Sequence, residues 1–134
     1  MIQLAGCIVQ NDQGEILLLH RNTPERVQWE LPGGKIEPDE APEDAVRREV
    51  FEELGITLTN LAPFGEDSFV EDNQEFHYHW FTAVIADGLP QPLEDKFDEV
   101  RYIPLAELAS LPLSANMRQL LPHILAVHLV SQPR

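Results

Sequence analysis

Cysteine is almost absent from this sequence of 134 residues, which contains only Cys7. A single thiol excludes an internal disulfide and any zinc cluster built from several cysteines. Cys7 lies within the apolar run of residues 4–9. A lone cysteine in such a run is expected to be a small buried core residue.

Basic residues and long apolar stretches are also scarce. Nine Lys and Arg residues stand against 23 Asp and Glu residues, which gives a formal net charge of −14. A field of this sign repels the backbone of DNA and RNA, so no polymeric nucleic-acid partner is expected. A small phosphate substrate is compatible, because bound cations reverse the field locally. Neither a membrane span of roughly 20 apolar residues nor a signal peptide is found, and a cytoplasmic monomer or homodimer is expected.

The pattern of apolar residues predicts one α/β domain over residues 1–134. Strands are predicted at residues 2–9, 15–20, 29–31, 61–70, 76–85 and 99–103. Helices are predicted at Pro42–Leu54, at residues 104–111 and over about 15 residues after Ser114, with loops at 21–28 and 87–97. This order favours helices packed on both faces of a mixed sheet.

The helix Pro42–Leu54 is the clearest of these elements. Proline suits the first helical position, and Val46, Val50 and Leu54 recur every four residues as an apolar stripe. Gly55 fits the left-handed residue that ends many helices. The stripe indicates which face of this helix packs on the core.

Three glutamates of the same helix share one face, because Glu49, Glu52 and Glu53 stand at positions i, i+3 and i+4. Carboxylates this close raise one another's pKa unless cations lie among them. Ligands that are all oxygen suit hard ions such as Mg²⁺ or Mn²⁺. For an isolated triplet, a solvated acidic face is the alternative interpretation. Arg48 reaches Glu52 at i+4 and can orient a carboxylate.

The segment from Gly34 to Ile56 extends this pattern at fixed spacing. It reads GKIEPDEAPEDAVRREVFEELGI, with a glycine, five residues, a glutamate, seven residues, Arg-Glu, an aliphatic, any residue, Glu-Glu, any residue, glycine and an aliphatic. This segment resembles the Nudix box at every specified position. The preceding Trp-Glu-Leu-Pro-Gly-Gly-Lys-Ile-Glu and the strand order are also similar to that family. The resemblance implies the Nudix α/β/α sandwich.

The resemblance also implies a hydrolase that depends on a divalent metal. Water attacks one phosphorus of a nucleoside diphosphate linked to another group, and Mg²⁺ or Mn²⁺ neutralises the pyrophosphate and helps to generate the nucleophile. Arg48 is expected to orient Glu49 or its neighbours, and Glu40 to stabilise the loop and helix. The metal ligands implied by matching positions are the Gly33 carbonyl, Glu49, Glu52 and Glu53.

The general base stays open between two residues. Some family members use a glutamate of the box, for which Glu49 is the candidate, and others use an acid from a later loop. Glu99 matches a position before the late strand where relatives often carry a metal-binding acid, and it is expected to be an additional ligand or the base. The expected catalytic residues are Arg48, Glu49, Glu53 and Glu99.

Within the family, the sequence most resembles the MutT-type nucleoside triphosphatases that act on oxidised dGTP. Arg21 ends the second strand where that group has a basic residue near the substrate. Residues 112–116, Pro-Leu-Ser-Ala-Asn, resemble the group's Pro-Pro-Ala-Asn segment, in which the Asn amide reads the purine edge. The expected reaction converts a nucleoside triphosphate, oxidised or not, to the monophosphate and pyrophosphate. The expected substrate-binding residues are Arg21, Gly34, Lys35 and Asn116.

Several alternatives stay open. Asn116 can instead be a structural residue of the last helix. ADP-ribose, nucleotide sugars and dinucleoside polyphosphates are alternative substrates, although the downstream proline and tyrosine expected for the first and last of these are missing. A non-catalytic nucleotide sensor is disfavoured because every box carboxylate is present. His77 and His79 share one face of a strand, where polar surface or cleft lining is favoured over a metal pair.

Overall fold

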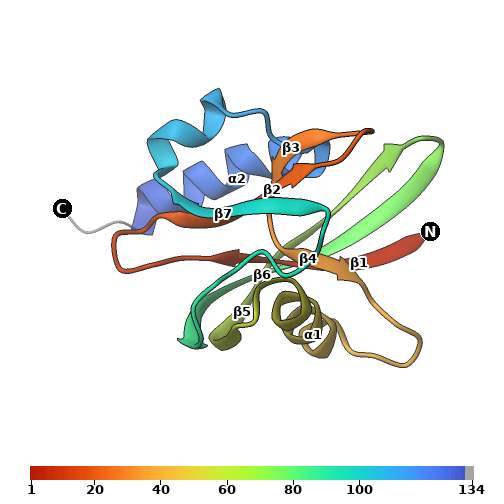
Figure 1. Ribbon diagram of the computed structural model, residues 1–134, viewed down its shortest axis with the longest axis horizontal. Helices are drawn as coiled ribbons and strands as arrows, with labels where there is room; N and C mark the ends of the chain where they lie inside the picture. The colour runs from red at the N-terminus through yellow and green to blue at the C-terminus, as the bar shows by residue number, and fades with distance from the viewer. Residues whose placement is uncertain (132–134) are drawn as a thin grey trace.

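The computed structural model describes residues 1–131 and consists of two β-sheets flanked by two long helices (Figure 1). The larger sheet has the order β4-β1-β6-β5 and the smaller one β3-β2-β7. In the larger sheet β1 and β6 run parallel while the other pairs are antiparallel. The strands are β1 Ile2–Val9, β2 Ile16–Asn22, β3 Val27–Glu30, β4 Gly33–Lys35, β5 Thr57–Glu71, β6 Gln74–Asp87 and β7 Phe97–Ile103. The helices are α1 Pro42–Leu54, the 3₁₀ helix η1 Leu105–Ser110 and α2 Ala115–Ser131.

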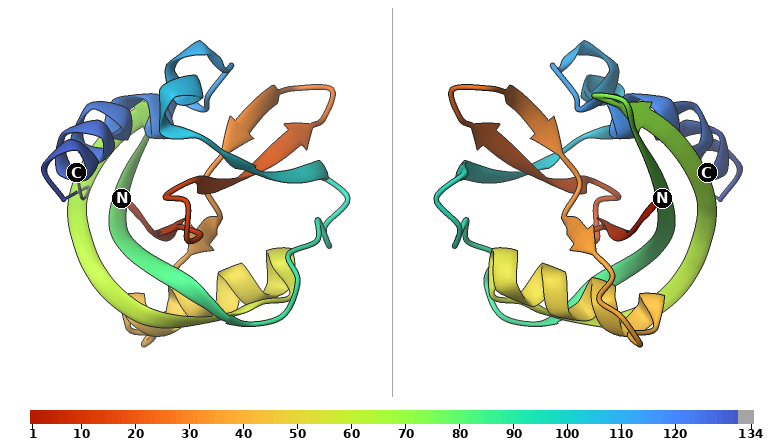
Figure 2. Two further views of the ribbon diagram at one scale, coloured as in Figure 1. Left: turned by 90° about the vertical axis from the view of Figure 1, so that its left-hand side faces the viewer. Right: turned by 90° about the vertical axis from the view of Figure 1, so that its right-hand side faces the viewer.

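The helices α1 and α2 lie on opposite sides of the sheets (Figures 1 and 2). Two hydrophobic clusters correspond to these two sides. Side chains alternate along a strand, so β1 and β2 contribute to both clusters. The α1 cluster includes Ala45, Val46, Val50 and Leu54 with Ala5, Cys7, Leu17 and Leu19. The α2 cluster includes Met117, Leu120, Leu121 and Ile124 with Ile8, Ile16, Leu18 and Trp80.

This arrangement confirms the predicted α/β fold with helices on both sides of a mixed sheet. The structure differs from the prediction of one sheet, because its strands form two separate sheets. The apolar pattern could not show this division, because β1 and β2 each have one row of apolar residues for each helix. Which strands pair depends on hydrogen bonds between distant segments, and these leave no period in the sequence.

Several strands are longer than the sequence predicted. β2 continues to Asn22 and β3 begins at Val27, so only four residues remain of the loop predicted at 21–28. No strand was predicted at residues 33–35, but Gly33–Lys35 pairs with β1 as β4. β5 begins at Thr57 rather than at residue 61, and residues 105–110 form a 3₁₀ helix. Partner strands impose these extensions on sequences with weak β-propensity of their own.

The predictions for α1 are confirmed in detail. Pro42 occupies the first turn, and Ala41 provides no side-chain cap. Gly55 has the left-handed φ of 73° and its N–H donates to the Phe51 carbonyl at 2.8 Å, which ends the helix just after Leu54. The position of this helix relative to β4 determines the geometry of the site described next.

Two further expectations concern single features of the chain. Cys7 is fully buried, and burial raises the pKa of its thiol to about 12. Within residues 1–131, no helix has the length and apolar character that crossing a membrane requires.

Candidate active site

A cavity of about 410 Å³ opens between α1 and the strands β2, β3, β4 and β6. Residues predicted to bind metal or substrate line much of it, namely Arg21, Gly33, Gly34, Lys35, Glu49, Glu53 and Asn116. Two predicted ligands, Glu52 and Glu99, do not line this cavity. The fold therefore gathers residues that are up to 95 positions apart, since Arg21 and Asn116 meet at one cavity.

Glu53 is the most deeply buried acid of the site, with 2% of its surface exposed. It projects from α1, and its Oε1 accepts a hydrogen bond of 2.8 Å from the Gly33 N–H of β4. Burial raises the pKa of Glu53 to about 8, and the Gly33 hydrogen bond opposes this shift. A carboxyl group in this setting ionises readily only if positive charge is brought near it.

Glu49 lies beside it, packed closely on the backbone of β4. A Cβ atom added to Gly34 would lie 2.3 Å from the Glu49 carboxylate, so any larger residue there would displace the Glu49 side chain. The pKa of Glu49 is raised, chiefly by burial and to a smaller extent by Glu52 and Glu94, while Arg48 lowers it. The sequence predicted repulsion as the cause, but removal from water is the larger one.

Arg48 connects the box glutamates to the loop before the helix. Its guanidinium donates to both carboxylate oxygens of Glu40, at 2.8 and 2.9 Å, and to Glu49 at 2.9 Å. It also donates to Glu52 at 3.1 Å and to the Lys35 carbonyl at 2.9 Å. The Arg48 hydrogen bonds, together with one from the Glu37 N–H, lower the pKa of Glu40 to about 2. One arginine thus balances three acids and joins β4 to α1.

The Glu99 carboxylate points away from the cavity. On β7, Val100 and Tyr102 pack against the α1 cluster, so alternation along the strand directs Glu99 and Arg101 to the other face. Glu99 forms an ion pair with Arg101 there, and the Arg101 guanidinium lies over the Trp29 ring. The expectation that Glu99 joins the box glutamates therefore does not match its position in the structure.

Glu94, in the loop before β7, lies closer to the box glutamates. The Leu93 N–H donates to the Glu53 carbonyl at 3.0 Å and the Gln91 N–H to the Leu54 carbonyl at 3.1 Å, which attaches this loop to the end of α1. The Glu94 charge acts on both Glu49 and Glu53. Its Oε1 is buried and accepts no hydrogen bond from the described part of the chain, although Lys96 Nζ lies 3.5 Å away. This oxygen therefore has an ion-pair partner in Lys96 but no hydrogen-bond donor among residues 1–131, and Glu94 itself does not line the cavity.

Other lining residues form a polar and aromatic region suited to a ligand. Arg21 donates to both oxygens of Glu30, at 2.5 and 3.1 Å, and Gln28 donates to the same carboxylate at 2.6 Å. The Asn116 amide makes no hydrogen bond to another residue among those described. Phe69 and Phe76 stack with ring centroids 5.0 Å apart at 12°. A flat ring system with polar edges fits this kind of surface.

Sequence reasoning missed Glu30, Phe69, Glu94 and Lys96. The sequence predicted a metal-binding acid near the start of the late strand, and both Glu94 and Glu99 match that description. Only the attachment of the Glu94 loop to the end of α1 distinguishes the two residues. Glu30 and Phe69 had no distinguishing pattern. Phe76 and Tyr78 also line the cavity, whereas Trp29 lies in the α2 cluster.

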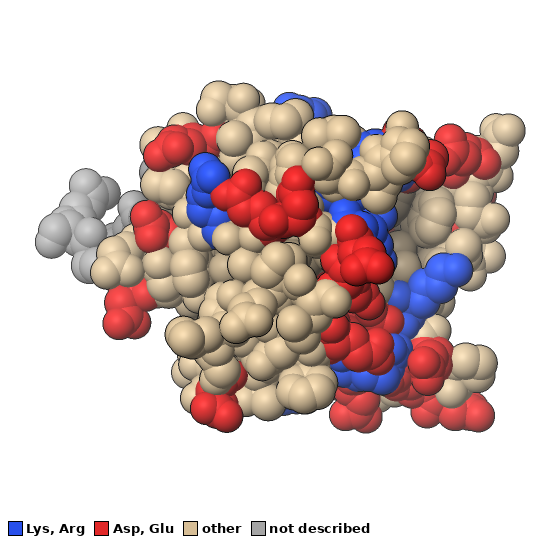
Figure 3. All heavy atoms as spheres, viewed as in Figure 1, with Lys and Arg blue, Asp and Glu red and all other residues tan. Residues whose placement is uncertain are grey.

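Charge is unevenly arranged around this site. On the face drawn in Figure 3, acidic side chains gather in a band beside α1 and β4, with basic side chains at its edges. The basic residues that line the cavity are Arg21, Arg26, Lys35 and Lys96. Although the chain carries −14 overall, the cavity thus offers both carboxylates for cations and cationic groups for phosphates.

Comparisons with known proteins assign the family. The NUDIX domain model matches residues 3–124. The nucleoside triphosphatase NudI of Klebsiella pneumoniae is 30% identical over 125 residues, covering 84% of this chain and 89% of that protein. The 8-oxo-dGTP diphosphatase of Escherichia coli is 42% identical over 65 residues, covering 47% of this chain and 50% of the relative. Several curated relatives are matched over only 35% to 50% of their own length.

Solved structures agree with this assignment. A MutT NUDIX hydrolase from Burkholderia pseudomallei superposes with a TM-score of 0.83 at 30% identity, covering 91% of this chain and 96% of the other. This similarity confirms the predicted Nudix α/β/α fold. From the matched domain, the box on α1 and this shared fold, we conclude that the chain belongs to the Nudix family and is related to its MutT-like members.

Proposed function

We propose that this protein is a hydrolase that uses divalent metal to cleave a pyrophosphate bond in a small nucleotide, converting a nucleoside triphosphate to the monophosphate and pyrophosphate. The observation that carries the proposal is the burial of Glu53 and the partial burial of Glu49 against β4, near the buried Oε1 of Glu94. Buried carboxylates with raised pKa are stabilised in their charged form when a cation binds among them. A sensor or a structural domain would not need this arrangement.

The available donors fit a hard cation such as Mg²⁺ or Mn²⁺, because they are all oxygen atoms. When bound, such an ion neutralises the pyrophosphate and lowers the pKa of water. We include Glu94 on the basis of its buried oxygen and leave Glu99 out because it faces Arg101. The residues proposed to hold metal are the Gly33 carbonyl, Glu49, Glu52, Glu53 and Glu94.

In the proposed reaction, the oxygen of a water molecule forms a bond to one phosphorus as the bridging P–O bond breaks. The electron pair of that bond leaves with the product that departs, either the monophosphate or pyrophosphate, and Glu49 takes the proton of the attacking water. Glu49 suits this role because its side chain is 17% exposed and Arg48 orients it at 2.9 Å. Lys35 and Lys96 line the same cavity and provide positive charge for the phosphates.

The substrate region favours a nucleoside triphosphate. The stacked rings of Phe69 and Phe76 offer a face for a base, and the free amide of Asn116 offers a donor and an acceptor for its edge. Two of the relatives act, by their names, on 8-oxo-dGTP and on nucleoside triphosphates. ADP-ribose, nucleotide sugars and dinucleoside polyphosphates are the competing substrates.

A substrate panel tests the proposal. Oxidised and normal nucleoside triphosphates and the competing substrates are assayed with Mg²⁺ and with EDTA, using wild type, Glu53→Gln and Glu107→Gln. Glu107 is an exposed acid of η1 and provides the matched control. We expect Mg²⁺-dependent release of pyrophosphate that Glu53→Gln reduces by on the order of 10²-fold or more, while Glu107→Gln behaves as wild type. Binding of nucleotides without turnover of any substrate would instead favour a sensor.

A further inference from the structure

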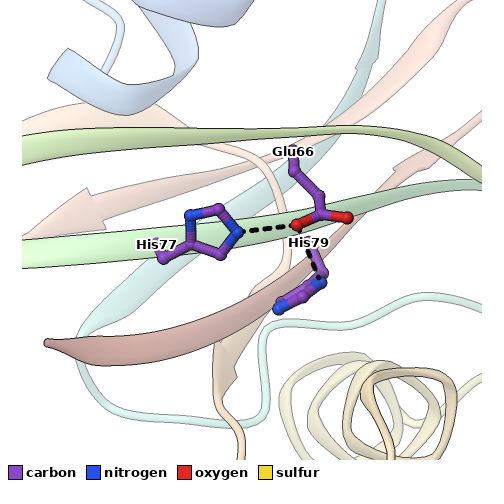
Figure 4. A group of neighbouring side chains, drawn as sticks. All are labelled: Glu66, His77 and His79. Carbon is purple, nitrogen blue, oxygen red and sulfur yellow. Dashed lines mark hydrogen bonds and ion pairs between the residues drawn. The ribbon is translucent and has the colours of Figure 1, made fainter.

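A second cluster of possible metal ligands, which includes none of the box glutamates, lies on β5 and β6 (Figure 4). Glu66 of β5 and His77 and His79 of β6 each offer one ligand atom, and these atoms lie within 4.8 Å of one another. Glu66 Oε1 lies 2.8 Å from His77 Nε2 and 3.8 Å from His79 Nδ1. Among the residues that the structure describes, no other group of three His, Cys, Asp or Glu side chains brings its ligand atoms this close together.

The position of this cluster separates it from the active site. His77 and His79 alternate along β6 with Phe76 and Tyr78, which line the 410 Å³ cavity. Side chains at alternate positions of a strand face opposite sides of the sheet. The histidines therefore face the α1 side, where Phe81 of the same strand packs in the α1 cluster. The two sites share no side chain.

Hydrogen bonds behind the two imidazoles orient their nitrogen atoms. The Gln3 Oε1 atom can only accept, so His79 Nε2 must be the donor in their 3.1 Å contact. In neutral His79 the Nδ1 atom then carries a lone pair, and it lies 3.8 Å from Glu66 Oε1. Both atoms are acceptors, so a cation between them would bind to both. His77 Nδ1 lies 2.9 Å from Ser68 Oγ, a hydroxyl that can accept its proton, so that a cation bound to Nε2 and Glu66 Oε1 can replace the 2.8 Å hydrogen bond between these two atoms. A metal ligand histidine is commonly supported in this way through its other nitrogen.

The strand pairing holds these groups in place without a long loop. Glu66 is the partner of His79, and Ser68 is the partner of His77, in the β5–β6 register. Glu66 and His79 also border a small cavity of about 170 Å³, which Pro42 and Glu43 of α1 line from the other side. The cluster is thus rigid on the strand side and open toward this cavity, where water can complete the coordination of an ion.

We propose that Glu66, His77 and His79 form a binding site for a borderline transition-metal ion, with Zn²⁺ as the best fit. Two imidazoles and one carboxylate suit Zn²⁺, Co²⁺ or Ni²⁺ far better than Mg²⁺, which prefers oxygen ligands. The bound ion joins β5 to β6 and leaves one coordination position for water. This inference does not depend on the proposed hydrolase activity, because it concerns the opposite face of β6.

Calorimetric titration of the full chain with Zn²⁺ tests the site, in excess Mg²⁺ so that the oxygen-ligand site is filled. Wild type is compared with His77→Gln/His79→Gln and with His20→Gln, a matched control whose imidazole pairs with the Asp98 carboxylate at 2.7 Å. We expect a Zn²⁺ site in wild type and in His20→Gln, with affinity reduced by about 100-fold or more in the double variant. Equal Zn²⁺ affinity in all three proteins, or no binding by wild type, would overturn the proposal.

Two further variants keep the test independent of folding defects in the double variant, and Co²⁺ adds a spectroscopic probe of the ligands. Glu66→Gln keeps both imidazoles, and Gln3→Ala keeps all three ligands but removes the hydrogen bond to His79. Each is expected to weaken Zn²⁺ binding by about 10–100-fold. Co²⁺ should give visible absorption bands of a nitrogen-ligated ion in wild type and not in the double variant. Identical Co²⁺ spectra in the two proteins would refute the assignment of the ligands.

Discussion

Because the Glu53 carboxyl group is buried, we predict that Glu53→Gln, which reduces activity, stabilises the metal-free protein. At pH 7 the Glu53 side chain is ionised in the unfolded chain, where its ordinary pKa is 4.5, but protonated in the folded chain, where burial raises the pKa to about 8. Folding at pH 7 therefore protonates Glu53, although this pH lies 2.5 units above the pKa of the unfolded chain. At about 1.4 kcal/mol for each pH unit, this lowers the free energy of unfolding by about 3 kcal/mol.

Glu53→Gln removes this penalty. The glutamine carbonyl can still accept the 2.8 Å hydrogen bond from the Gly33 N–H, so the contact between β4 and α1 is kept. Its buried NH₂ group offsets part of the gain if it lacks an acceptor, by about 1–3 kcal/mol. In EDTA at pH 7 we expect the variant to be more stable than wild type, by about 3 kcal/mol at most.

The stability gained by Glu53→Gln should increase with pH. A carboxyl group whose folded pKa is raised contributes its full stability below the unfolded pKa and loses it as the pH rises through the folded pKa. Urea denaturation in EDTA should therefore show the gain from Glu53→Gln to be near zero at pH 4, larger at pH 7 and greatest above pH 8. Saturating Mg²⁺ should stabilise wild type and not the variant. A variant that is less stable than wild type by the same amount at every pH would refute the reasoning.

Three further predictions test separate parts of the site. In thermal melts with increasing Mg²⁺, Glu94→Gln should lower the affinity for Mg²⁺ by about 10–100-fold, whereas Glu99→Gln should leave it unchanged. The reverse result would show that Glu99, and not Glu94, belongs to the metal site. Asn116→Ala should reduce discrimination among bases by ~1–3 kcal/mol in kcat/KM, and an equal loss for every substrate would show that Asn116 is structural. Cys7 should react with a thiol reagent only after unfolding, because it is fully buried with a pKa raised to about 12; rapid labelling of the native protein would contradict its burial.

Much of the active site was predictable because it lies on one helix. The period of α1 places Glu49, Glu52 and Glu53 on one face and brings Arg48 within reach of Glu52, as the 3.1 Å hydrogen bond confirms. Capping signals at Pro42 and Gly55 fixed the ends of that helix. Local spacing was sufficient for these features, since each depends on residues only a few positions apart.

Features that depend on distant segments were not predictable. β4 exists because Gly33 and Gly34 pair with β1, and nothing in a Gly-Gly sequence signals that pairing. Glu94 approaches Glu49 and Glu53 because its loop is bonded to the end of α1, while Glu99 turns away because of the alternation of β7. The position of each acid relative to the box is thus a property of the tertiary fold.

The central claim is that the buried carboxylates hold metal for cleavage of a pyrophosphate bond, and analysis of the reaction products tests it most directly. A nucleoside triphosphate that wild type turns over is incubated in water enriched in ¹⁸O with Mg²⁺, and the phosphorus products are identified by ³¹P NMR. The account predicts nucleoside monophosphate and pyrophosphate in equal amounts, with ¹⁸O in one of them, no turnover in EDTA, and turnover reduced by on the order of 10²-fold or more with Glu53→Gln. Release of inorganic phosphate and nucleoside diphosphate, or full turnover by Glu53→Gln, would contradict it.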